Sequence, residues 1–164
     1  MDTYLNFKIM TKAKNYIPKD FHTVTPFLVV DGGLDLIDFL VTGLGGKQLF
    51  VMKDDNGVLT HGTVQVGDSM IMIGDTMKEM PSQTAMLYLY VKDADAAYNQ
   101  ALGANAENVR EPKDEFYGDR AAAVKDRWGN TWWFATQKED VEDAELERRA
   151  QEAYKKQNGE QPVY

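Results

Sequence analysis

The strongest constraint in this sequence is an order of elements that occurs twice. Residues 21–75 are predicted to form a strand, a helix and three strands, and residues 85–138 repeat that order. Runs rich in β-branched and aromatic residues, bounded by turns, indicate the strands, and apolar residues spaced three and four apart indicate the helices. The repeat predicts an α+β chain built from two βαβββ modules in tandem.

The predicted strands are Thr23–Val30, Lys47–Lys53, Leu59–Val66, Ser69–Ile73, Met86–Val91, Ala106–Glu111, Arg120–Lys125 and Thr131–Thr136. One helix is predicted around Leu34–Val41 and the other over Asp93–Leu102. Segment Lys113–Asp119 is predicted to be a loop. The domain therefore covers 21–138, after an N-terminal extension at 1–20.

Residues 139–164 differ in character from the rest of the chain. Glu139–Gln157 is highly charged, with few regular apolar positions, and is predicted to be a helix followed by a frayed tail. Two interpretations remain open for this helix. It is either a solvated terminal helix or a helix that packs across a dimer partner.

Composition excludes several classes of function. Asp and Glu outnumber Lys and Arg by 26 to 18, giving a net charge of −8, which repels nucleic acid and anionic membrane surfaces. The chain has no cysteine, so disulfides and thiolate chemistry are excluded. No apolar run approaches the ~20 residues of a membrane span. The first 19 residues lack the apolar block of a secretory signal, so we expect a cytoplasmic protein.

Several motifs occur in a characteristic order. They are His22 through Asp31, Ile37-Asp38-Phe39, Val66-Gly67-Asp68-Ser69, Phe116-Tyr117-Gly118-Asp119-Arg120, Val124-Lys125-Asp126 and Trp128-Gly129-Asn130-Thr131-Trp132. Together they resemble the PhnB-like branch of the vicinal-oxygen-chelate superfamily, also called the glyoxalase/bleomycin resistance/dioxygenase superfamily. The resemblance implies a curved mixed sheet around a pocket, helices outside it, and a homodimer.

Enzymes of that superfamily hold a divalent metal with four His, Glu or Gln side chains, two from each module. The corresponding positions here are Thr25, Met72, Met86 and Trp133, which cannot form a site for a hard cation. We therefore expect neither a metal nor another cofactor. Met72, Met86 and Trp133 are instead candidate ligand-binding residues, since methionine and aromatic side chains form adaptable apolar pockets.

The chain has two histidines, and His61 is the candidate catalytic residue. It lies in a predicted hairpin strand whose alternate residues face the pocket, and imidazole can act as base or acid near neutral pH. A structural role for His61, bonded to a backbone carbonyl, is an equal alternative. His22 precedes the first strand and is interpreted as a polar residue at its entry.

The Phe116–Arg120 segment supplies the remaining candidates. Tyr117 is a possible hydrogen-bond donor and Arg120 a possible partner for an anionic or polar ligand group. Alternatively, Asp119 and Arg120 pair with each other to hold the loop. Trp132 and Trp133 must point to opposite sheet faces, so we expect Trp133 in the cavity and Trp132 under a helix.

Two functions follow from these residues. The first is metal-free binding of a small aromatic or polycyclic molecule. The second is a lyase, epimerase or dioxygenase type of enzyme, dependent on His61 or on a divalent metal bound elsewhere. The vacated metal positions favour binding.

Overall fold

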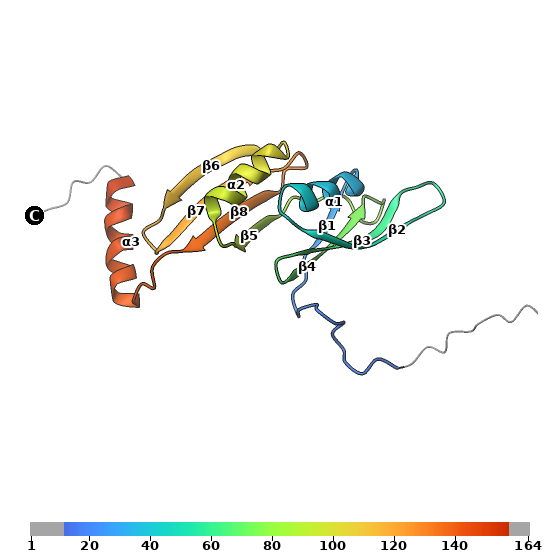
Figure 1. The fold of residues 1–164 in the computed structure, drawn as a ribbon, viewed down its shortest axis with the longest axis horizontal. Coiled ribbons are helices and arrows are strands. Elements are labelled where there is room, and N and C mark those ends of the chain that lie inside the picture. Colours follow the sequence, from blue (N-terminus) through green and yellow to red (C-terminus); the bar gives the residue numbers. More distant parts are fainter. Residues whose placement is uncertain (1–11, 158–164) are drawn as a thin grey trace, which may run out of the picture.

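The structure is a computed structural model that describes residues 12–157 of the chain and contains two four-stranded sheets. The first holds β1 (Phe27–Val30), β2 (Lys47–Lys53), β3 (Leu59–Val66) and β4 (Ser69–Asp75) in the order β1-β4-β3-β2. The second holds β5 (Met86–Tyr90), β6 (Glu107–Asp114), β7 (Asp119–Lys125) and β8 (Thr131–Gln137) in the order β5-β8-β7-β6. The sheets lie side by side along the length of the molecule (Figure 1).

The two sheets are built to the same plan. In each, the outer first strand runs parallel to the last strand, and the remaining neighbours are antiparallel. Helix α1 (Gly33–Thr42) follows β1, and α2 (Ala94–Gly103) follows β5. The predicted repeat of two βαβββ modules in an α+β chain is therefore confirmed.

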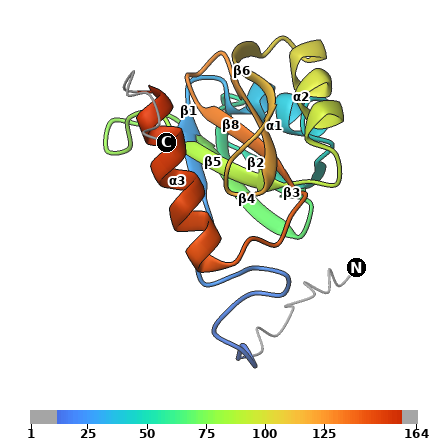
Figure 2. The same ribbon diagram turned by 90° about the vertical axis from the view of Figure 1, so that its left-hand side faces the viewer.

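Each sheet buries one face under its own helix. Alternate residues of the strands point to that face, so Leu28, Val64 and Ile73 join Ile37 of α1 in the core. Gly62 faces α1 because a Cβ there would lie 2.7 Å from the Ile37 side chain. In Figure 2 the two helices lie together on one side of the sheets.

Trp132 belongs to the same core. It is fully buried and its ring centroid lies 6.2 Å from that of Phe39 in α1. The expectation that Trp132 lies under a helix is confirmed, although the helix that it meets through this ring belongs to the other module.

The turn before β8 joins the two modules. The Trp128 indole N–H donates to the backbone oxygen of Asp31 at 2.7 Å, and Arg127 pairs with Asp35. The Arg127 guanidinium also lies over the Trp128 ring, 4.3 Å from its centroid. Trp128 therefore connects the second module to the loop that leads into α1.

A buried carboxylate, Asp126, organises this turn. It is 3% exposed and accepts hydrogen bonds from the backbone N–H groups of Trp128 and Asn130, and from the side chains of Asn130 and Trp132. All four lie between 2.9 and 3.0 Å. Asn130 in turn accepts from the backbone of Ala85 at the start of the second module.

Several predicted strands differ from the structure by one or two residues at an end, and two strands differ by more. The first starts at Phe27 rather than Thr23, because the segment before it turns and Thr25 bonds to the backbone oxygen of His22. His22 therefore lies outside the sheet. The strand predicted to end at Glu111 continues to Asp114, which pairs with Arg120 across a register shift.

Helix α3 (Asp143–Gln157) follows the second module and lies across its end (Figures 1 and 2). A C-terminal helix was predicted, and the structure confirms it. Residues 1–11 of the expected N-terminal extension and residues 158–164 of the expected tail lie outside the described residues. In the described part of the chain no helix is both long and apolar enough to cross a membrane.

We predict that Asp126→Ala lowers the free energy of unfolding by about 2–4 kcal/mol, since it leaves buried donors without an acceptor. Urea unfolding followed by circular dichroism measures this change. Asp68→Ala, in the exposed β3–β4 turn, is the control and should change stability by less than about 0.5 kcal/mol. Equal effects of the two substitutions would contradict the role assigned to Asp126.

Candidate functional site

The candidate site is the sheet face that the helices leave uncovered. Because strand residues alternate between faces, every core residue under a helix has neighbours in sequence that point the other way. On both sheets these neighbours include aromatic residues with substantial exposure. We call this side of each sheet its open face.

A row of paired residues crosses the open face of the first sheet. Phe27 of β1 pairs with Met72 of β4, Met72 with Thr63 of β3, and Thr63 with Phe50 of β2. Phe50 is 51% exposed, whereas Thr63 is buried. The row is thus apolar at both ends and has a hydroxyl in the middle.

His61 lies on the same face of β3 as Thr63, two residues before it in the sequence. Its ring centroid is 6.1 Å from those of both Phe27 and Phe50, so the imidazole sits between two aromatic rings. His61 Nε2 lies 3.3 Å from the Thr63 hydroxyl oxygen. The structure thus places His61 on the open face, but its polar partner is a hydroxyl and not a carboxylate.

The equivalent row of the second sheet is richer in aromatic and charged groups. Tyr88 of β5 pairs with Trp133 of β8, Trp133 with Ala123 of β7, and Ala123 with Arg110 of β6. The Tyr88 and Trp133 rings are nearly parallel, with an interplanar angle of 15° and centroids 6.0 Å apart. The small Ala123 leaves room between the stacked rings and Arg110.

Arg110 extends this aromatic stack. Its guanidinium lies 5.6 Å from the centre of the Trp133 ring, within the range of a cation–π contact. The same guanidinium pairs with Glu115, whose side chain is only 10% exposed. The charge of Arg110 is therefore already balanced by a nearly buried carboxylate.

Asp119 provides a second carboxylate on this open face. It is 5% exposed, and the Tyr88 hydroxyl lies 3.5 Å from one of its oxygens, at the long limit of a hydrogen bond. A hydrogen bond to the same carboxylate raises the pKa of Tyr90. Burial raises the pKa of Tyr88, and contact with Tyr117 adds to this effect.

The loop between β6 and β7 positions Tyr117 and Asp119. Gly118 has φ +95°, and a Cβ there would lie 2.8 Å from the backbone oxygen of Glu139. The Gly118 oxygen also accepts from the backbone N–H groups of Lys138 and Glu139. Phe116 meets Tyr117 edge to face, with ring centroids 5.2 Å apart. The segment after β8 therefore holds this loop against the end of the sheet.

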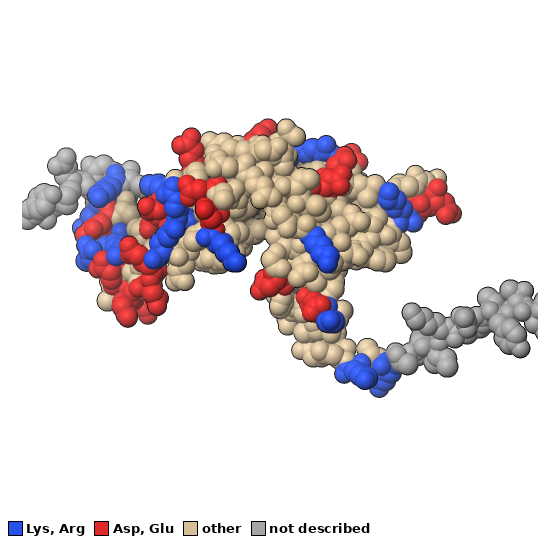
Figure 3. Space-filling view, viewed as in Figure 1, with Lys and Arg blue, Asp and Glu red and all other residues tan. Residues whose placement is uncertain are grey.

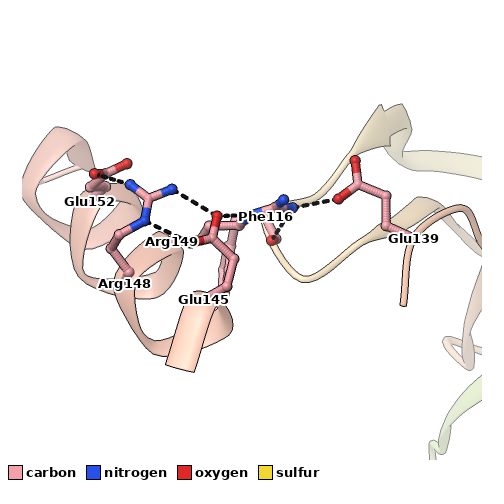
Figure 4. A network of polar contacts seen from close by, with 6 residues as sticks. All are labelled: Phe116, Glu139, Glu145, Arg148, Arg149 and Glu152. Atoms are coloured by element: carbon pink, nitrogen blue, oxygen red, sulfur yellow. Dashed lines mark hydrogen bonds and ion pairs between the residues drawn. The ribbon is translucent and has the colours of Figure 1, made fainter. Parts of the chain in front are cut away.

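Helix α3 reaches the same loop through charged side chains (Figure 4). Arg149 donates to the Phe116 backbone oxygen at 3.5 Å and pairs with Glu139 at 2.7 Å and Glu145 at 2.8 Å. Arg148 pairs with Glu145 and Glu152. These pairs link the helix to the backbone beside Tyr117.

Charged side chains are unevenly distributed over the molecule. In the view of Figure 3 they gather over α3 and over the turn between β2 and β3, while the middle of the molecule carries few. The net negative charge of the chain is therefore not concentrated over the central region seen from this side.

Comparison with known proteins agrees with this geometry. Residues 21–134 match the model of the Glyoxalase/Bleomycin resistance protein/Dioxygenase superfamily, which is more than half of the chain. The chain belongs to that superfamily. An uncharacterized protein of Mycobacterium bovis is 29% identical over 120 residues, covering 66% of this chain and 79% of the relative.

Solved structures of the superfamily's fold are also similar. A PhnB protein from Bacillus cereus superposes with a TM-score of 0.56 at 15% identity, over 70% of this chain and 99% of its own. TnmS3, an antibiotic binding protein from Streptomyces sp. CB03234, gives a TM-score of 0.55 at 21% identity, over 71% and 97% of the two chains. At these identities the likeness establishes the fold.

The four positions that the family resemblance predicts to correspond to metal ligands hold no His, Glu or Gln side chain. Thr25 precedes the first sheet, Met72 lies in its open-face row, Met86 is 74% exposed on β5, and Trp133 is in the second row. Within residues 12–157 no three His, Cys, Asp or Glu side chains come together in a way that could hold a metal ion. The donor set of the superfamily's metalloenzymes is thus not reproduced there.

The structure separates the predicted site residues. Met72 and His61 lie on the first sheet, whereas Met86, Tyr117 and Trp133 belong to the second module. A pairing between Asp119 and Arg120 was one interpretation of the sequence, and it is wrong. Arg120 points to the α2 side and pairs with Asp95 and Asp114, because adjacent residues of a strand face opposite sides. Arg120 is thus on the face opposite Trp133.

The residues missed by sequence reasoning are Tyr88, Tyr90, Arg110 and, as a site residue, Asp119. The alternation of Met86, Tyr88 and Tyr90 along one strand was a usable signal, because it places three large side chains on one face. The proximity of Arg110 and Glu115 had no such signal. It arises from the extension of β6 beyond Glu111.

We predict that Asp119→Asn lowers the pKa of Tyr90 toward the ordinary value of 10.0, because the hydrogen bond to the carboxylate is the main cause of its increase. Absorbance of the phenolate as a function of pH measures this shift. Comparison with Tyr90→Phe, alone and combined with Asp119→Asn, isolates the contribution of Tyr90. A titration of Tyr90 that is unchanged in Asp119→Asn would contradict the contact.

Proposed function

We propose that this protein binds a small aromatic or polycyclic molecule on its open faces and releases it unchanged, without a metal or another cofactor. The observation that carries this proposal is the pair of aligned rows: Phe27, Met72 and Phe50 on one sheet, and Tyr88 and Trp133 on the other. Aromatic and methionine side chains favour flat ligands, because they offer large contact area and polarizable surfaces.

The donor chemistry supports binding over metal-dependent catalysis. Met72, Met86 and Trp133 occupy positions where the family resemblance predicts the metal ligands of the superfamily's enzymes. Thioether and indole groups are poor ligands for hard divalent metals. The antibiotic binding protein TnmS3 has the same fold. It is a precedent for binding of an antibiotic by a protein of this architecture.

Catalysis by His61 has less support. In the described part of the chain the hydrogen-bond partner of its side chain is Thr63, so no carboxylate orients the imidazole. Tyr117 and Arg120, the residues that were expected beside it, lie in the other module, and Arg120 points to the helix side. A base in this position would act without a carboxylate to orient it.

We also propose a homodimer, in which a second copy covers the open faces. Large apolar side chains on these faces are exposed in the single chain: Phe27, Phe50, Met52, Met86, Tyr88 and Tyr90. A contiguous apolar surface of this kind usually marks an interaction site. Facing two such surfaces toward each other would enclose a cavity that a single chain leaves open.

We predict that the protein sediments with twice the mass of one chain. Phe50→Glu should convert a large fraction of it to monomer at micromolar concentration, because a charge would be buried between the copies. Sedimentation velocity measures the change. Val58→Glu, in an equally exposed position at the tip of the β2–β3 hairpin, is the control and should leave the dimer intact. A wild-type monomer at all concentrations would contradict the proposal.

We predict that wild-type protein binds planar aromatic compounds with a saturable quenching of tryptophan fluorescence. Trp133→Ala should weaken this binding by about 1–3 kcal/mol, the usual cost of losing a stacked aromatic group. Trp128→Phe changes an indole at the module junction and should preserve affinity. Isothermal titration calorimetry provides the dissociation constants.

The same binding should be unaffected by EDTA, and elemental analysis of the purified protein should find no stoichiometric Ni, Zn, Mn or Fe. A stoichiometric metal whose removal abolishes binding or activity would replace sequestration by metal-dependent chemistry. Absence of saturable binding across neutral and charged planar compounds at high micromolar concentration would also contradict the proposed function.

A further inference from the structure

The geometry points to a binding site for a ligand's ammonium group on the second sheet, formed by the Asp119 carboxylate and the rings of Tyr88, Tyr90 and Tyr117. This inference rests on the proposed function and specifies the chemical class of the ligand. The molecule bound would be an aromatic compound that carries a protonated or quaternary amine.

Asp119 is the group that requires an explanation. It is 5% exposed, and its side-chain partners are phenols: the Tyr88 hydroxyl lies 3.5 Å away, and a hydrogen bond to Asp119 raises the pKa of Tyr90. A carboxylate removed from water is costly unless a cation or several short hydrogen bonds compensate for it. Within the described residues no cation pairs with Asp119, and its hydrogen bond from Tyr88 is long.

Two neighbouring arginines of the described chain are engaged elsewhere. Arg110 pairs with Glu115, and Arg120 pairs with Asp95 and Asp114 on the other side of the sheet. Lys138 lines a hollow of about 410 Å³ next to Asp119, but its nitrogen is not within the 4.0 Å of an ion pair. The negative charge of Asp119 is therefore available to a ligand.

Aromatic rings flank this carboxylate. The Tyr88 and Tyr90 ring centroids are 5.5 Å apart with planes at 59°, and Trp133 stacks with Tyr88. Phenols are neutral at physiological pH, and the raised pKa values of Tyr88 and Tyr90 move both further from ionisation. Neutral aromatic faces beside a buried carboxylate attract a cation by two independent effects, cation–π attraction and direct charge pairing.

The first sheet has no equivalent arrangement. By the same strand register, Asp119 corresponds to the buried Leu59 of β3. Tyr88 and Tyr90 correspond to the apolar Phe27 and Val29 of β1. Charge recognition would therefore be confined to one end of the ligand site. The apolar part of the ligand would extend along Trp133 and toward Met72 and Met86.

The test uses three probes that share one ring system: naphthylmethylamine, which is protonated at neutral pH, neutral naphthylmethanol, and anionic naphthylacetate. Wild-type protein should bind the amine at least about tenfold more tightly than the alcohol, which corresponds to ~1.4 kcal/mol, and the acid most weakly. Asp119→Asn should remove the preference for the amine and leave the affinity for the alcohol unchanged.

Glu111→Gln is the matched control, because it removes the same charge from an exposed position on β6 near Tyr98 of α2. It should retain the preference for the amine, which excludes a long-range effect of net charge. Circular dichroism and thermal unfolding verify that both variants fold. If Asp119→Asn does not fold, the relative affinities of wild-type protein for the amine, the alcohol and the acid still test whether the site prefers an ammonium group.

Each outcome has a distinct meaning. Equal binding of amine and alcohol to wild-type protein, or an undiminished preference in a folded Asp119→Asn, overturns the ammonium site and leaves aromatic binding in place. Failure of all three probes to bind overturns the proposed function as well. A trimethylammonium analogue that binds as tightly as the amine supports the site and assigns more of the attraction to the aromatic rings than to a hydrogen bond.

Discussion

Each four-stranded sheet of this protein has one helix to cover it, and this unequal covering controls the rest of the structure. The burial of Leu28, Val64 and Ile73 against α1, and of Phe134 beneath α2, supplies the apolar contacts that hold each module together. The opposite face of each sheet receives no helix from its own module. Its side chains are therefore free to serve binding, and they are aromatic where a solvent-facing sheet would carry polar groups.

The two modules are related in plan and differ in content. Corresponding rows of residues cross the two open faces, but one row ends in phenylalanine and the other combines a stacked tyrosine and tryptophan with an arginine. His61 on the first sheet occupies the position that Ala121 holds on the second, as the strand register shows. A ligand lying between such faces would meet unlike surfaces and would have one preferred orientation.

The sequence was sufficient to predict the larger features. Hydrophobic periodicity predicts the repeated order of strands and helices. The opposite orientations of Trp132 and Trp133 follow from the geometry of any strand. The same rule places the adjacent residues Asp119 and Arg120 on opposite faces of the sheet, as the structure does.

Other features depend on distances that a single sequence does not encode. Arg110 and Glu115 meet only because β6 continues through Pro112 to Asp114, where propensity favoured a loop. Trp128 meets the backbone of Asp31 across 97 residues of chain. Contacts of this kind are set by the packing of one module on the other, which local patterns do not specify.

The attachment of α3 has a consequence for how the protein responds to its solution. The Arg148 and Arg149 guanidinium groups hold the pKa of Glu145 at about 2, so moderate acid leaves that carboxylate ionised. Arg148 is exposed to solvent and Arg149 is partly exposed, however, and dissolved ions screen contacts of this type. The attachment of α3 to the backbone beside Tyr117 would thus depend on ionic strength more than on pH.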